Sequence, residues 1–111
     1  MTTPNIFLYV QNLLGIGHLR RAAAISRALA EIGLDVNFVS GGIPIPNLNV
    51  GRAKFHQLPP VRSLDRNFKV LVDETGREID DRWRQNRCSK LLNLFEETKP
   101  SMILTELFPF G

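Results

Sequence analysis

The sequence predicts an α/β fold built around a parallel β-sheet. Three observations lead to this prediction: short apolar runs rich in β-forming residues, a helical apolar period between them, and glycines or prolines where segments end. Alternating strands and helices are typical of βαβ units, whose crossovers are right-handed. A chain of 111 residues is long enough for one such domain.

The first unit is a strand, a glycine loop and a helix. Residues 6–10 (IFLYV) form an almost continuous apolar run, which suits a central strand buried on both faces. The glycine loop 15–17 follows, and residues 18–32 then show helical spacing. Gly33 stands where a C-cap glycine is common. The predicted buried face of this helix comprises Ala22, Ile25, Leu29 and Ile32.

The middle of the chain predicts two further strands. Residues 36–39 form the second strand, and residues 43–51 are rich in proline, asparagine and glycine, which indicates a loop. Residues 54–58 alternate in character and suit a third strand. Residues 61–79 give mixed signals: residues 68–72 fit a short helix or an added strand, and Thr75-Gly76 indicates a turn.

The last part predicts a long helix and a closing strand. Asp80 or Asp81 is a suitable N-cap for a helix that continues to about Thr98. Residues 102–105 (MILT) predict another buried strand, so the expected strand order is about 3-2-1-4, with helices flanking a Rossmann-like sheet. The predicted buried stripe of the long helix comprises Cys88, Leu91, Leu92 and Phe95.

Composition excludes several classes of protein. The 14 Lys and Arg residues exceed the 11 Asp and Glu residues only slightly and are interleaved with them, so we expect no nucleic-acid binding. Weak contact with anionic lipid or phosphate remains open. One cysteine, Cys88, permits no internal disulfide or cysteine-based metal site. We expect no metal and no cofactor, and a cytoplasmic protein that is at most peripheral to a membrane.

The glycine loop is the strongest local signal. Gly15, Ile16 and Gly17 join the first strand to the first helix, and Arg20 and Arg21 follow in its first turn. Such a loop lets a ligand approach the first helical amides, which favour phosphate or developing negative charge. The alternative is a tight turn that needs glycine geometry and nothing else.

Two nucleotide-binding patterns are missing from this loop. No Gly-Lys-Ser/Thr sequence is present, which excludes a P-loop. The dinucleotide fingerprint needs a third glycine where Arg20 stands, and an acidic residue at the end of the second strand, where Ser40 and Gly41 stand. An NAD- or flavin-dependent oxidoreductase is therefore a weak alternative.

His18 and Glu106 are the candidate catalytic residues. Because a helix N-terminus disfavours the imidazolium form, we expect a neutral His18 ring that can deprotonate a hydroxyl group. Glu106 follows the last strand and should emerge at the same sheet edge, where a carboxylate would orient the imidazole. The alternatives are a capping or packing histidine and a surface carboxylate. His56, Cys88 and Trp83 are expected to be structural, the last two packed on the long helix.

Residues 9–25 (YVQNLLGIGHLRRAAAI) resemble the N-terminus of predicted glycosyltransferases related to family 28, a group similar to the MurG-like enzymes. The resemblance continues through residues 39–42 (VSGG), 57–60 (QLPP), 72–74 (VDE) and 105–111 (TELFPFG), and so spans essentially the whole chain. The first and last of these motifs are the specific ones.

The resemblance implies a GT-B architecture of two Rossmann-like domains, in which this chain supplies the N-terminal, acceptor-side domain. It also implies an inverting transfer from a nucleotide-sugar donor, with His18 as base and, more loosely matched, Glu106 as its orienting acid. We expect residues 1–111 to be an incomplete first domain without the donor-binding domain, and inactive alone. An open sheet edge and the apolar residues 107–110 predict self-association.

The alternative function is a free-standing half-domain that holds a phosphate or a partner protein without catalysis. A donor domain encoded directly downstream would favour the glycosyltransferase. The sequence does not identify the donor sugar or the acceptor.

Overall fold

The computed structural model describes residues 3–64, 66 and 69–107 of the chain. Its elements, in chain order, are β1 (Asn5–Gln11), α1 (Gly17–Glu31), β2 (Asp35–Ser40), β3 (Lys54–Gln57), β4 (Arg62–Ser63), β5 (Leu71–Val72), α2 (Asp81–Thr98) and β6 (Met102–Leu107).

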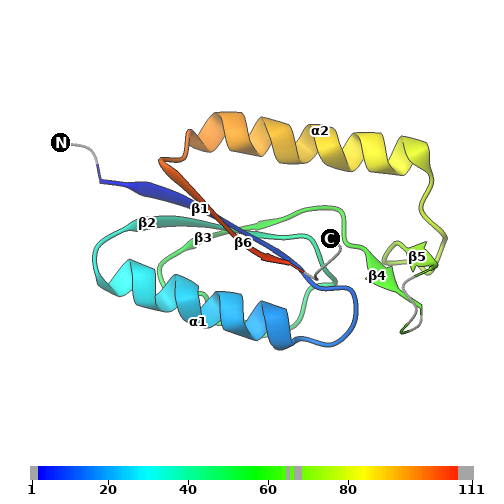
Figure 1. The fold of residues 1–111 in the computed structure, drawn as a ribbon, viewed down its shortest axis with the longest axis horizontal. Coiled ribbons are helices and arrows are strands. Elements are labelled where there is room, and N and C mark those ends of the chain that lie inside the picture. Colours follow the sequence, from blue (N-terminus) through cyan, green and yellow to red (C-terminus); the bar gives the residue numbers. More distant parts are fainter. Residues whose placement is uncertain (1–2, 65, 67–68, 108–111) are drawn as a thin grey trace.

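A four-stranded parallel sheet in the order β3-β2-β1-β6 forms the centre of the molecule. The predicted order is confirmed, because β6 is the strand that follows the long helix. Figure 1 shows α1 and α2 on opposite faces of this sheet. The fold is therefore α/β and Rossmann-like, and all four strands end at one edge, as parallel strands must.

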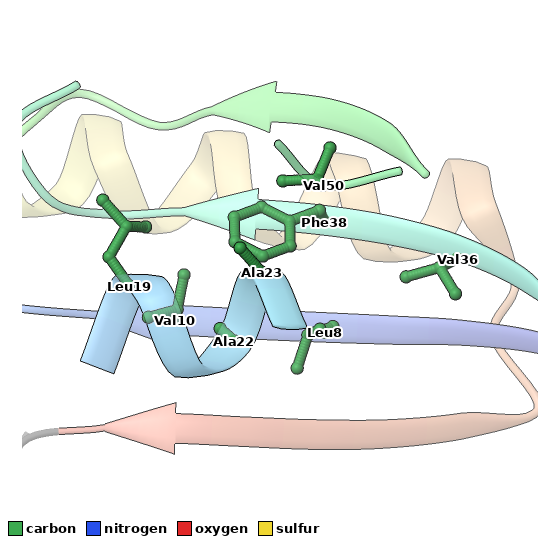
Figure 2. Close-up of a cluster of buried hydrophobic side chains, with 8 residues drawn as sticks. All are labelled: Leu8, Val10, Leu19, Ala22, Ala23, Val36, Phe38 and Val50. Carbon is green, nitrogen blue, oxygen red and sulfur yellow. The ribbon is translucent and has the colours of Figure 1, made fainter. Parts of the chain in front are cut away.

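The main core lies between α1 and the sheet. Small side chains of α1 let the helix approach β1 and β2 closely, and the Ser26 hydroxyl donates a hydrogen bond to Val50 O at 2.8 Å. Phe38 is fully buried here, and burial of a side chain this large contributes about 1.5–3 kcal/mol. Figure 2 shows the cluster: Leu8, Val10, Leu19, Ala22, Ala23, Val36, Phe38 and Val50.

The predicted face of α1 is correct only in part. Ala22 is buried and Ile25 and Leu29 are partly buried, but Ile32 is 74% exposed. The helix ends at Glu31, so Ile32 is already its C-cap and lies beyond the packed turns. Gly33 has a φ of +89°, as expected for a glycine that terminates a helix.

The buried stripe predicted for α2 is correct for Leu91 and Phe95, which face the sheet, and wrong for Cys88 and Leu92. Cys88 is exposed, Leu92 is 55% exposed, and no residue of α2 is fully buried. Leu91 packs against Phe7, Val39 and Leu58 together with Leu94, which was not predicted, and Phe95 lies edge-on to Phe7. The predicted N-cap is confirmed, since the Asp80 carboxylate accepts a hydrogen bond from Trp83 N at 2.8 Å.

Two further expectations are settled by the strands. The segment 61–79 contains an antiparallel pair, β4 with β5, and Gly76 forms a turn at φ +89°. Residues 102–105 do form a strand, but it is not buried: β6 is an edge strand whose Met102 and Ile103 are more than half exposed. Part of the apolar segment 107–110, residues 108–110, lies outside the described residues.

Candidate functional site

The loop between β1 and α1 lies at the edge of the sheet where the strands end. Gly15 has a φ of +70°, which favours glycine for steric reasons. Gly17 has no such requirement, and a Cβ atom built there would meet open space. Backbone conformation therefore accounts for a glycine at position 15 but not at position 17. Because Gly17 has no side chain, the backbone there is bare and accessible.

The N-terminus of α1 has no side-chain cap. Ile16 is the N-cap residue, and no side chain bonds to the first amides of the helix in the described structure. Unpaired amides at a helix N-terminus are the donors that bind anionic groups. Arg20 and Arg21 are both exposed in this turn.

His18 and Glu106 are in contact. The parallel pairing of β1 with β6 places Glu106 opposite Val10, on the face that α1 covers. His18 Nδ1 lies 2.6 Å from Glu106 Oε1. The Glu106 side chain is only 16% exposed, and that of His18 is 32% exposed. The sequence-based expectation that both residues emerge at the same edge is thus met, while their catalytic roles remain a prediction.

Arg21 is the third member of this group. Its Nη1 donates to the same Glu106 Oε1 at 3.3 Å, and its side chain is 68% exposed. One carboxylate oxygen therefore accepts from both an imidazole and a guanidinium. Arg21 was predicted as a ligand-binding residue of the loop, and the structure shows it in contact with the candidate orienting acid.

The His18 contact determines which ring nitrogen is available. A carboxylate oxygen accepts hydrogen bonds, so Nδ1 carries the proton that points to Glu106. In the neutral ring, Nε2 then has a free lone pair. This is the arrangement in which an acid fixes the tautomer of a catalytic base.

A polar network over the other face of the sheet was not predicted. Gln11 Nε2 donates to Gly41 O at 3.1 Å, and Arg87 of α2 donates to both Gln11 Oε1 and Gly41 O. A Cβ on Gly41 would collide with the Arg87 and Gln11 side chains. Two features of the sequence could have indicated this network. Polar residues, Gln11-Asn12, end the first apolar strand, and two glycines, Gly41-Gly42, follow the second strand.

Among the residues that the structure describes, two buried polar atoms at this edge have no hydrogen-bond partner: Asn12 Oδ1 and Ser40 Oγ. Ser40 is 1% exposed and ends β2. Asn12 holds the loop through a 2.9 Å bond from Nδ2 to Gly15 O. Polar atoms left unpaired inside a protein are uncommon and concentrate at functional sites.

His56 and Trp83 lie away from this group. His56 Nε2 lies 2.9 Å from Asn37 Oδ1, within the sheet. Trp83 is half-buried at the start of α2, with the Arg87 guanidinium 5.8 Å from its ring centroid. No helix in the described ranges combines the length and apolar character needed to cross a bilayer. Comparisons with protein families, with curated proteins and with solved structures found no match to this chain.

Proposed function

We propose that this chain forms the acceptor side of an inverting glycosyltransferase, which moves a sugar from a nucleotide-sugar donor to an acceptor hydroxyl. One observation carries the proposal: the imidazole of His18 is held through Nδ1 by Glu106, at the edge of a parallel sheet where ligands of such folds bind. The sequence resemblance to family 28 transferases supports the same activity.

In the proposed reaction, His18 Nε2 accepts the proton of the acceptor hydroxyl as its oxygen attacks the anomeric carbon. The bond between that carbon and the donor phosphate oxygen breaks, and the nucleoside diphosphate leaves with the electron pair. Glu106 stabilises the imidazolium that forms. Attack opposite the leaving group inverts the anomeric centre.

Arg21 also contacts the carboxylate of Glu106. Its Nη1 bonds to the same Glu106 oxygen as His18 Nδ1, so it helps to hold that oxygen beside the imidazole. The bare backbone at Gly17 leaves room for the acceptor beside His18. We assign the donor-binding residues to a second domain of GT-B type and the reaction to the cytoplasm, as parts of the same proposal.

The test is sugar transfer by the protein expressed from its native gene. A panel of radiolabelled nucleotide-sugars is incubated with an extract of the native host as the acceptor source. His18→Ala should lower the transfer rate about 10²- to 10⁴-fold, which is the usual contribution of a general base. Glu106→Gln should cost roughly tenfold or more, because it no longer fixes the imidazole.

The double variant distinguishes a functional pair from two independent residues. If Glu106 acts through His18, the loss in the double variant should be close to that of His18→Ala alone. His56→Gln is the matched control, since His56 belongs to β3 and contacts Asn37. Near-normal transfer by His18→Ala would show that His18 is not the base.

A non-catalytic anion-binding module is the second candidate, favoured by the uncapped amides of α1. It predicts phosphate binding that is insensitive to Glu106→Gln and no sugar transfer with any donor. Transfer that depends on His18 excludes it.

A further inference from the structure

Arg87 reaches from α2 to the ends of three strands. Its Nε donates to Pro59 O at 3.0 Å, and its Nη2 donates to Gly41 O at 3.1 Å and to Tyr9 Oη at 3.3 Å. Nη2 also donates to Gln11 Oε1. The guanidinium is therefore fixed by oxygens at the ends of β1 and β2 and just after β3.

None of these partners carries a negative charge. The ion pairs in the described ranges involve His18, Arg21 and Arg84, and Arg87 is in none of them. Carbonyl and amide oxygens offset part of the desolvation of a half-buried guanidinium, but its full charge remains. The described structure therefore gives the Arg87 guanidinium neutral hydrogen-bond acceptors but no counter-ion.

The group has one amino nitrogen left for a ligand. Within the described structure, Nη1 donates to no protein atom, whereas Nε and Nη2 are both engaged. A carboxylate binds arginine best through two parallel N–H groups, and the Nε–Nη2 pair is occupied. A tetrahedral phosphoryl group does not need two parallel N–H donors in one plane, and it carries more negative charge than a carboxylate. It therefore fits a guanidinium with one unengaged nitrogen better.

We propose that Arg87 binds a phosphoryl group of a ligand at the strand-end edge of the sheet, on the face opposite His18. The placement supports this: Val10 and Glu106 point to the α1 side, whereas Tyr9 and Gln11 point to the α2 side, where Arg87 meets them. A Cβ on Gly41 would displace the Arg87 and Gln11 side chains, which fill its space. The site does not depend on His18 being a base.

The experiment is a titration of the ¹⁵N-labelled chain with inorganic phosphate, at constant ionic strength adjusted with sodium chloride. The Arg87 Nε–H signal and the amides of Gln11 and Gly41 should shift and saturate. Arg87→Gln should weaken phosphate binding roughly tenfold or more, the expected loss for a charge-assisted hydrogen bond. Pyrophosphate and acetate, titrated in parallel, distinguish a diphosphate from a single phosphoryl group and from a carboxylate.

Arg84→Gln is the matched control. It removes the same charge from the same helix one turn earlier. Arg84 Nη1 lies 3.8 Å from Asp81 Oδ1. The variant should bind phosphate with an affinity within about twofold of the wild type. If Arg87→Gln does not fold, Arg87→Lys keeps the charge, and its spectrum shows whether the fold survives. Shifts confined to residues 16–20 would place the anion at α1 instead and overturn the proposal. Three other results would also overturn the proposal: saturation by acetate but not by phosphate, an absence of saturable shifts, or phosphate binding by Arg87→Gln that equals that of the wild type.

His18→Ala separates this proposal from the proposed function. It should lower the rate of sugar transfer about 10²- to 10⁴-fold and leave phosphate binding at Arg87 unchanged. If Arg87→Gln loses phosphate binding but the wild-type protein transfers no sugar, the proposed function fails. If the wild-type protein transfers sugar but Arg87→Gln binds phosphate as well as the wild type, the phosphoryl site at Arg87 fails.

Discussion

The two histidines of the chain have different environments. His18 faces a carboxylate, whereas His56 donates through Nε2 to an amide oxygen, Asn37 Oδ1. Asn37 in turn donates to Asn5 Oδ1 at 2.8 Å, and Asn5 donates to Thr98 O at the end of α2. Burial, and then the nearby Lys54 charge, lower the pKa of His56 below 6.5, although Glu97 acts in the opposite direction.

The free energy of unfolding should therefore decrease as the pH falls, and part of this decrease should depend on His56. Because the pKa of His56 is lower in the folded than in the unfolded chain, the unfolded chain binds the proton more readily. The stabilisation is complete above 6.5 and is lost as the pH falls from there to the folded pKa. Urea midpoints at about pH 7.5 and 5.5 measure the loss. His56→Gln, which keeps an amide donor for Asn37, should lose less than the wild type.

Asp73→Asn is the control for this pH window. The hydrogen bond from the Thr75 hydroxyl lowers the pKa of Asp73 below 3.8, so this carboxylate stays ionised throughout the window. The variant should lose as much stability between the two pH values as the wild type does. An equal loss in His56→Gln and wild type would contradict this account of His56.

At the level of its elements, the chain holds α2 on the sheet through the partly buried Leu91 and Leu94, the ring of Phe95 and the hydrogen bonds of Arg87. Asp80 caps its start, and Lys99 ends it in the left-handed conformation, at φ 46°. No side chain between these caps is fully buried. The stability of this helix therefore depends on a few defined contacts.

Substitutions in α2 should reflect this. Asp80→Ala should lower the free energy of unfolding by about 1 kcal/mol, because the amide of Trp83 loses its acceptor. Leu92→Ala, at a side chain that is mostly exposed, should change it by less than about 0.5 kcal/mol. Urea titration measures both, and a larger loss for Leu92→Ala would contradict the observed orientation of α2.

The sequence predicts β1, α1 and the strand order well but only part of the face of α2. Continuous apolar runs and terminal glycines define the first unit, whereas residues 91–95 contain four apolar side chains that span almost half of the helix circumference, about 160° at 3.6 residues per turn. Periodicity cannot select among them, and two-residue strands such as β4 give no signal at all. His18 and Glu106 could be paired because parallel strands end together. Arg87 was missed because its position depends on the rotation of α2.

At the scale of the whole molecule, the two edges of the sheet differ. β3 is short and carries Lys54 and Gln57, which discourage pairing with another sheet. β6 has six residues, and its Met102 and Ile103 are exposed. Long apolar edges of this kind favour association through added strands.

The isolated chain should therefore self-associate with increasing concentration. Ile103→Lys places a charge on the open edge at a side chain that is 52% exposed, so it should shift the chain toward monomer without unfolding it. Sedimentation velocity over a concentration series measures this, with Lys54→Ala on the opposite edge as control. A wild-type chain that remains a monodisperse monomer at every concentration would contradict the prediction.

The ring tautomer of His18 shows whether Nε2 is free to act as a base. Long-range ¹H–¹⁵N NMR at alkaline pH, where histidine side chains are neutral, reports which ring nitrogen carries the proton. The contact with Glu106 predicts a proton on Nδ1 and a free Nε2, and Glu106→Gln should weaken this preference. A proton on Nε2 in the wild type would mean that the nitrogen assigned to take the acceptor proton is already occupied, and the proposed base would be excluded.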